Sequence, residues 1–236
     1  MSSKPLTKSL PQDAAARRAI FRDAVDVALG DVDAVMAAAH LSPPTMALPH
    51  IDVQPTLTKD NTVEVQVVRV MEVPDASVSQ VSAALWRLIH HQLSQLVHYD
   101  PMAQSTVLEE VDADTLYTRY QCQFGPDQPR IESKSICHRR TLSADATTIV
   151  YRCFMDDAAF PTAANHVRHD EHGSLVVYCN PATKVTTVKM VSFLRPLADP
   201  AHPPAEGVAD EFLHHLRASA DVAMRILRQN IHDASA

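Results

Sequence analysis

Glycine is scarce in this sequence, and its scarcity argues against several classes of nucleotide-binding and hydrolytic site. Only four glycines occur among the 236 residues: Gly30, Gly125, Gly173 and Gly207. A P-loop, a dinucleotide-binding fingerprint and a nucleophile elbow each need glycines at close spacing. None of these motifs is present, and each glycine is expected near the boundary of a helix or strand.

Cysteine is equally sparse, and its spacing suggests neither a metal site nor a disulfide framework. Cys122, Cys137, Cys153 and Cys179 each fall inside a segment that we predict to be a strand, and no Cys-x-x-Cys pattern occurs. We therefore expect buried free thiols in a reducing compartment. No metal and no cofactor is predicted.

Basic clusters and long apolar runs are also missing. The formal net charge is −7, whereas nucleic acids and anionic membranes are bound through clustered Lys and Arg. The nearest such cluster is Arg139-Arg140, whose side chains would point to opposite faces of a strand. Residues 1–12 lack the apolar core of a signal peptide, and no later run reaches transmembrane length. We therefore expect a soluble, cytoplasmic protein that binds no nucleic acid and contacts membranes at most transiently.

What is present is a succession of strand-like segments joined by turns too short for crossover helices. Successive strands this close in sequence pair antiparallel. A strand is predicted at Thr62–Val73, where valines alternate with Glu64 and Gln66. Six more, rich in β-branched and aromatic residues, are expected at Ser105–Val111, Leu116–Phe124, Ser133–Leu142, Thr147–Met155, Ser174–Cys179 and Thr183–Phe193.

The segments before the first strand differ in kind. Asp13–Ala39 is rich in alanine and predicts a helix. Gly30 followed by Asp31 leaves open whether it is one helix or two. Leu41–Asp60 carries four prolines, which predicts a surface strap or a linker rather than a helix or an interior strand.

Two further helices are predicted on either side of the strand-rich region. Ser77-x-x-Gln80 is a capping-box pattern and begins a helix that runs to about Val97. Val208–His232 repeats apolar residues at helical spacing. At 1.5 Å per residue it would be about 37 Å long, enough to lie across the face of a curved sheet.

Five phrases in the sequence resemble a known family, in that family's order. They lie between Trp86 and Arg195 and are Val107–Tyr117, Phe160–Pro161, Asn165–Arg168, Gly173–Val177 and Thr183–Thr186. The stretch resembles the lipid-transfer domains related to the steroidogenic acute regulatory protein, the START domains. The resemblance implies an α+β helix-grip fold, in which a curved antiparallel sheet of about seven strands wraps around the long C-terminal helix.

The resemblance also implies a domain plan and a ligand class. Residues 1–61 would be an N-terminal helical extension with a proline-rich linker, and residues 62–236 the START-like domain. That domain would enclose one lipid-like molecule, with the C-terminal helix and nearby loops as the lid. The family's Arg-Asp-Phe signature is degraded here, with Arg130-Ile131 and Lys134-Ser135-Ile136 in its neighbourhood. The family's ligand is therefore not carried over.

Alternation along the strands predicts which side chains face the ligand. One face of Thr147–Met155 is apolar, while Thr148 and Arg152 mark the other. Ordinary core packing is the competing explanation for each inward position. The candidate ligand-binding residues are Leu116, Tyr120, Cys122, Tyr151, Cys153 and Met155 on the strands, with Phe212 and Leu216 on the C-terminal helix.

Histidine is abundant, and three histidines lie close together around two carboxylates. His166, His169 and His172 flank Asp170 and Glu171, so metal-ligand types occur at close spacing. The segment is expected to be a loop, and its spacing matches no zinc signature. No metal site is predicted there.

Three functions remain open at this point. The first is non-covalent binding of a hydrophobic molecule, for transfer or sensing. The second is an enzyme of the polyketide cyclase or dehydratase type, which would need an inward acid or base; the candidates are Glu109, Glu110, His138 and His215. The third is a ligand-sensing interaction module that acts through the N-terminal helix. No residue is assigned a catalytic role.

Overall fold

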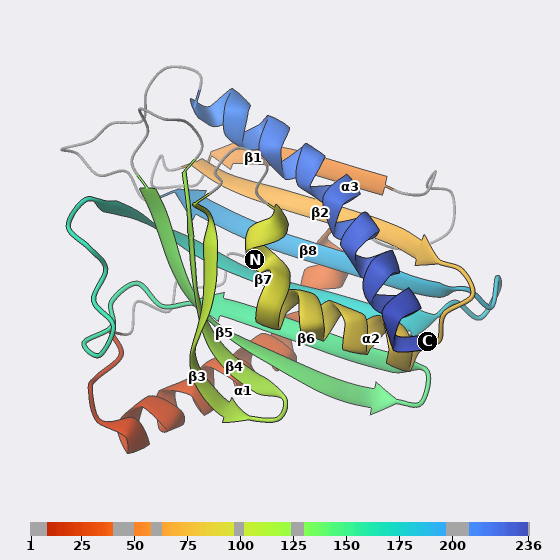
Figure 1. Cartoon of the computed structure of the whole chain (residues 1–236), viewed down its shortest axis with the longest axis horizontal. Helices are drawn as coiled ribbons and strands as arrows, with labels where there is room; N and C mark the ends of the chain where they lie inside the picture. The colour runs from red at the N-terminus through yellow and green to blue at the C-terminus, as the bar shows by residue number, and fades with distance from the viewer. Residues whose placement is uncertain are drawn as a thin grey trace.

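The computed structural model describes residues 9–39, 50–57, 63–96, 102–123, 130–196 and 208–235. Within these ranges the chain forms one curved eight-stranded sheet with helices on both faces (Figure 1). The predicted α+β class and antiparallel arrangement are confirmed.

The strand order in the sheet is β1-β2-β8-β7-β6-β5-β4-β3, and neighbours pair antiparallel. A short parallel pairing joins Arg130–Glu132 of β5 to His166–Arg168 of β7. The strands are β1 (His50–Leu57), β2 (Val63–Val73), β3 (Gln104–Asp112), β4 (Thr115–Cys122), β5 (Arg130–Ser143), β6 (Ala146–Cys153), β7 (His166–Cys179) and β8 (Thr186–Pro196).

Two strand predictions were wrong. Residues 50–57 were expected in a strap or linker, yet they form β1 at the edge of the sheet. Pro55, opposite Val65, is tolerated because an edge strand needs ladder hydrogen bonds on one side only. The segment from His166 to Gly173, expected to be a loop, is the first half of β7. The sheet therefore has eight described strands rather than about seven.

The helices begin where the sequence indicates. α1 (Ala14–Ala38) is a single helix through Gly30, and Asp13 caps it by accepting a 2.8 Å bond from the Ala16 amide. α2 (Val78–Arg87) begins with the predicted capping box of Ser77 and Gln80. A π-helical turn, η1 (Leu88–Gln92), and a 3₁₀ turn, η2 (Leu93–Leu96), continue it, and α3 spans Val208–Ser235.

α2 and α3 lie on one face of the sheet, which we call the inner face (Figure 1). Val81 and Leu85 of α2 and Leu227 of α3 share a buried cluster with Ile149 of β6 and Val177 of β7. Because side chains alternate along a strand, these contacts fix which residues of each strand point inward.

α1 covers the opposite, outer face, where it packs against β5, β6 and β7. Phe21 of α1 clusters with Tyr117, Ile136 and Phe154. Farther along the helix, Val32 packs against Val150 of β6. The helix thus shares its core with strands of the predicted ligand-binding domain. The proposed division at residue 61 stays a prediction.

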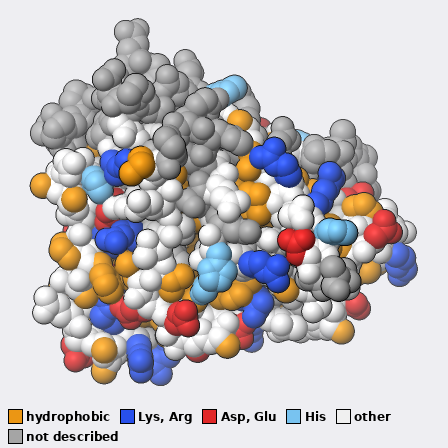
Figure 2. Space-filling model, in the orientation of Figure 1, with side chains coloured by type: hydrophobic (Ala, Val, Ile, Leu, Met, Phe, Trp, Pro, Cys, Tyr) orange, Lys and Arg blue, Asp and Glu red, His pale blue; other side chains and the backbone are white. Residues whose placement is uncertain are grey.

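On the face shown in Figure 2, the described Lys, Arg, Asp and Glu side chains are interspersed, with hydrophobic groups between them. None of the helices in the described part of the chain combines the length and apolar character needed to cross a membrane.

Candidate ligand-binding face

The register of the sheet places five of the predicted ligand-binding residues on the inner face. Leu116 lies opposite Cys137, which lies opposite Tyr151, and directly paired residues project to the same side. Alternation from Leu116 and Tyr151 adds Tyr120, Cys122 and Cys153 to this face. Whether they contact a ligand stays a prediction.

The other three predicted residues are less well placed. Met155 follows the end of β6 and is partly buried. Its carbonyl oxygen accepts a 3.3 Å hydrogen bond from Arg168. The side chains of Phe212 and Leu216 lie outside the described residues, and their roles stay predictions.

A tyrosine crosses β7 at the centre of the inner face. Tyr151 of β6, Gly173 of β7 and Ser192 of β8 lie opposite one another. The Tyr151 hydroxyl is 2.5 Å from the Ser192 hydroxyl. A Cβ atom at position 173 would collide with the phenol and with the Val191 carbonyl. Gly173 was expected at a strand boundary. It instead lies within β7, where only glycine leaves room for the phenol.

Two charged residues flank this tyrosine. Ser192 pairs with Val67 of β2, and Arg69 lies two residues farther along the same face. Glu171 likewise lies two residues from Gly173. Arg69 is only 7% exposed. Burial lowers the pKa of its guanidinium, while electrostatic interaction with Tyr151 and Glu171 opposes that shift.

We call Arg69, Tyr151, Glu171 and Ser192 the polar quartet. Burial and the nearby charge of Glu171 hold the pKa of Tyr151 well above its ordinary value, so the phenol stays protonated. Apart from Tyr151, sequence reasoning missed the quartet. One signal was available: Arg69 interrupts an otherwise apolar alternation in β2 at an inward position.

A second set of polar contacts lies beside the quartet on the inner face. The Cys153 thiol is 3.0 Å from the Ser135 hydroxyl, and His169 Nε2 is 3.1 Å from Glu171 Oε2. Burial raises the pKa of Cys153 well above its ordinary value. Because thiolate is the reactive form of cysteine, this residue is poorly suited to act as a nucleophile.

The candidate catalytic acids and bases do not converge on the inner face. Glu109 accepts a 2.6 Å bond from Arg17 of the outer helix α1. His138 alternates with the inward-facing Cys137 and contacts Thr115 Oγ1 at 2.9 Å through Nδ1. Glu110 is exposed. The fourth candidate, His215, has a side chain outside the described residues.

The three histidines of β7 do not all lie on one face of the sheet. By alternation His166 and His172 face outward, whereas His169 faces inward. His166 contacts Glu132 at 3.0 Å, and His172 stacks on Phe193 with ring centroids 5.0 Å apart. Among the described residues, no three His, Cys, Asp or Glu side chains form a group suited to a metal ion.

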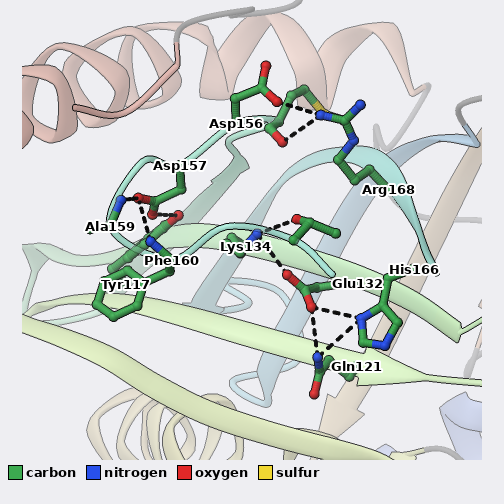
Figure 3. Close-up of polar contacts among 12 residues, drawn as sticks. Tyr117, Gln121, Glu132, Lys134, Asp156, Asp157, Ala159, Phe160, His166 and Arg168 are labelled. Carbon is green, nitrogen blue, oxygen red and sulfur yellow. Dashed lines mark hydrogen bonds and ion pairs between the residues drawn. The ribbon is translucent and has the colours of Figure 1, made fainter. Parts of the chain in front are cut away.

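The outer face instead holds two polar clusters, which bind the segment between β6 and β7 and the helix α1 to the sheet (Figure 3). In the first, Glu132 contacts Lys134, His166 and Gln121 at 2.7, 3.0 and 2.7 Å. Burial alone would raise the pKa of Glu132, but these hydrogen bonds lower it to about 2. Glu132 therefore stays ionised beneath the segment between β6 and β7, where Lys134 also bonds to Thr162 at 2.5 Å.

The second outer cluster is centred on Asp157, which follows β6. Its carboxylate accepts hydrogen bonds from the Tyr117 hydroxyl at 2.8 Å and from the amides of Ala159 and Phe160 at 2.9 and 3.1 Å (Figure 3). It also binds Arg17 of α1 at 2.7 Å. The cluster fastens the N-terminal helix to the sheet.

Comparison with known proteins identifies the architecture. No family model and no curated protein matches the sequence. Human StAR-related lipid transfer protein 5 matches in structure with a TM-score of 0.52, at 10% identity over 86% of this chain and 98% of that protein. The chain has the START-like helix-grip fold.

Two further structures match this START-like fold. A STAR-related lipid transfer protein fragment from Xanthomonas axonopodis aligns with a TM-score of 0.51 and 11% identity, covering 75% of this chain and 98% of the fragment. Human STARD10 aligns with a TM-score of 0.51 and 9% identity, covering 82% and 77%. Likenesses at such low identity establish the START-like fold and leave the ligand to be argued from the residues.

Proposed function

We propose that this protein binds one lipid-like molecule without covalent chemistry, between the inner face of the sheet and the helices that cross it. The observation that carries the proposal is the START-like fold, since two of the matched proteins are named for lipid transfer. The driving force would be removal of apolar ligand surface from water, about 25 cal/mol per Å².

The chemistry of the inner face supports binding over catalysis. Leu116, Val67 and Leu194 supply buried apolar surface, while Tyr151 and Cys153 are held in their neutral forms. The acids and bases considered for a cyclase or dehydratase lie on the outer face, on the surface or outside the described residues. None of the four candidates named for the enzyme alternative is therefore described on the inner face.

A sensing role is the second candidate, and one feature of β6 favours it. Val150 and Tyr151 are adjacent, so one contacts α1 on the outer face while the other lies at the centre of the inner face. A ligand that moves β6 would therefore also act on α1. A partner that binds only one ligand state would distinguish sensing from transfer.

The proposed function is tested first by what co-purifies with the protein. Native mass spectrometry should find one small hydrophobic molecule per chain, and solvent extraction should release it for identification. A broad lipid panel should then include members that bind at a stoichiometry near one and raise the denaturation midpoint. If no lipid binds and no midpoint moves, the proposal is wrong. The cytoplasmic location stays a prediction, to be checked by cell fractionation.

A further inference from the structure

The inner face changes from an apolar end to a polar centre, and Arg69 lies at the border, in the same row as Leu175 and Ile149. At the end covered by α2, the inward residues include Ile149, Leu175, Val177 and Val188, all apolar and buried. At the centre stand the four residues of the polar quartet. Methionine or leucine at position 69 would serve a purely hydrocarbon ligand better, since burying charge carries a large desolvation cost.

The register of β2, β8, β7 and β6 places the quartet residues at neighbouring inward positions. Tyr151 reaches Ser192 across Gly173, which lacks the side chain that would block the phenol. Arg69 lies one inward position from the strand partner of Ser192, and Glu171 one inward position from Gly173. Ser192 is only 2% exposed. Four polar side chains from β2, β6, β7 and β8 thus lie within three successive rows of inward positions, and Tyr151 interacts electrostatically with both Arg69 and Glu171.

The hydrogen-bonding chemistry of the quartet is mixed. Arg69 only donates, an ionised Glu171 only accepts, and the two hydroxyls do both. A ligand hydroxyl can accept from the guanidinium and donate to the carboxylate. A ligand carboxylate would instead meet the negative charge of Glu171, and a hydrocarbon would use none of the four groups.

Resting on the proposed function, we propose that the ligand is an uncharged amphiphile whose hydroxyl group is bound by Arg69, Tyr151, Glu171 and Ser192. The remainder of the ligand is apolar and packs against neighbouring inward residues such as Val67 and Leu194. The quartet therefore selects alcohols over hydrocarbons of the same shape, and over acids.

The test uses two matched series on the full-length protein. The straight-chain series is 1-hexadecanol, hexadecane and hexadecanoate, and the sterol series is cholesterol, 5-cholestene and cholesterol sulfate. Affinities are measured by displacement of a bound apolar fluorescent probe. In at least one series the alcohol should bind about 10-fold or more tightly than the hydrocarbon, the ratio expected for a hydrogen bond to a charged group.

Four variants connect that preference to the quartet. Ser192→Ala and Tyr151→Phe, which remove single oxygen atoms, should each reduce the alcohol-to-hydrocarbon ratio. Arg69→Met should bring the ratio of alcohol to hydrocarbon affinity close to one. Arg139→Met is its matched control on the same inner face, because Arg139 pairs with Asp114 at 2.7 Å and lies over the Trp86 ring instead of joining the quartet. Glu171→Gln should raise the affinity for the anionic member of the series relative to the alcohol.

The outcomes separate this inference from the proposed function. If neither the probe nor any of the six compounds binds, the proposed function fails. If compounds bind but alcohol and hydrocarbon are equal, or the anion is preferred by the unmodified protein, the hydroxyl assignment is overturned while lipid binding stands. A preference that survives Ser192→Ala and Tyr151→Phe also overturns it, even if Arg69→Met does not fold.

Discussion

Arg17 ties the N-terminal helix to the sheet through one buried side chain. Its guanidinium is only 2% exposed and binds both carboxylate oxygens of Asp157, at 2.7 and 3.1 Å. The Asp157 side chain is fully buried. The guanidinium carbon also lies 5.4 Å from the centroids of three aromatic rings, those of Phe21, Tyr117 and Phe160.

Replacement of Arg17 should therefore be costly. Arg17→Met leaves the buried Asp157 carboxylate without its ion pair, a change that costs about 3 to 5 kcal/mol in other proteins. Denaturant unfolding should show this loss. Arg18→Met, at an exposed position of the same helix, should change stability by no more than about 0.5 kcal/mol. Equal effects of the two substitutions would contradict a structural role for the buried pair.

His172 should make stability depend on pH. Burial and nearby Arg152 lower the pKa of its imidazole to about 4, compared with about 6.5 in an unfolded chain. Between these values the unfolded state binds more protons. The contribution of His172 is therefore present above about pH 6.5 and lost as pH falls toward 4.

Unfolding midpoints of His172→Gln, compared with those of the unmodified protein, isolate this effect. The stability of the variant should fall less between pH 7 and pH 5. His232→Gln, at an exposed position of α3, should keep the original slope. Glu132, with its pKa of about 2, loses its contribution only below about pH 4.5 and so acts mostly outside this window. Parallel curves for His172→Gln and the unmodified protein would refute the assignment.

At the scale of elements, the C-terminal half of α3 anchors this helix to the rest of the protein. Leu227 is only 1% exposed and packs with α2 and the inner face of the sheet. Val222 and Ile226 pack against Leu88 at the start of η1. The other end of α3 begins with the segment that contains Phe212, which is predicted to roof the ligand.

Substitutions at the two ends of α3 should therefore differ in kind. Leu227→Ala should lower the free energy of unfolding by about 2 to 5 kcal/mol, with or without ligand, because it leaves a cavity in packed core. Phe212→Ala should cost less stability and speed ligand release, because a roof has fewer packing partners. Denaturant melts and ligand off-rates of both variants decide the matter. If both variants lose the same stability and neither changes the ligand off-rate, α3 packs as core along its whole length and does not roof the ligand.

At the scale of the whole molecule, the sheet has a packed layer on each side. α1 closes the outer face through Phe21 and its neighbours, and α2 with α3 covers the inner face. Ligand bound between the inner face and its helices would be held by the folded state alone. Binding and global stability are then linked.

A bound ligand should stabilise the protein by mass action. At a free ligand concentration 100 times Kd, the gain is about 2.7 kcal/mol at 25 °C. Unfolding midpoints measured over a ligand titration should rise logarithmically above Kd. A midpoint that stays constant through a saturating titration would mean that the ligand binds folded and unfolded chains alike, as a surface adsorbate does.

Chelation should have no such effect. The β7 histidines divide between the two faces, so we expect EDTA to leave the unfolding midpoint unchanged. A fall in the midpoint that added Zn²⁺ reverses would show that a metal contributes to folding.

Local sequence determined most of the elements, β1 and the first half of β7 excepted, and, on two strands, the direction of the side chains. The capping box of Ser77, the alternation on β4 and β6 and the spacing of α3 are short-range patterns. They reflect the period of two residues in a strand and of 3.6 residues in a helix, which do not depend on any tertiary contact. The inward assignment of Leu116 and Tyr151 could be predicted for that reason.

Only the tertiary structure decided which residues meet. Arg69, Tyr151 and Ser192 stand on strands far apart in the chain, and the register that joins them follows from packing on both faces. β1 exists because β2 offers it a partner, which outweighs Pro55 in a locally weak strand. Gly173 was expected at the end of a strand, and only the pairing of β6 with β7 shows that the Tyr151 ring lies over it. Strand pairing is non-local, so the candidate site became visible only when the sheet was assembled.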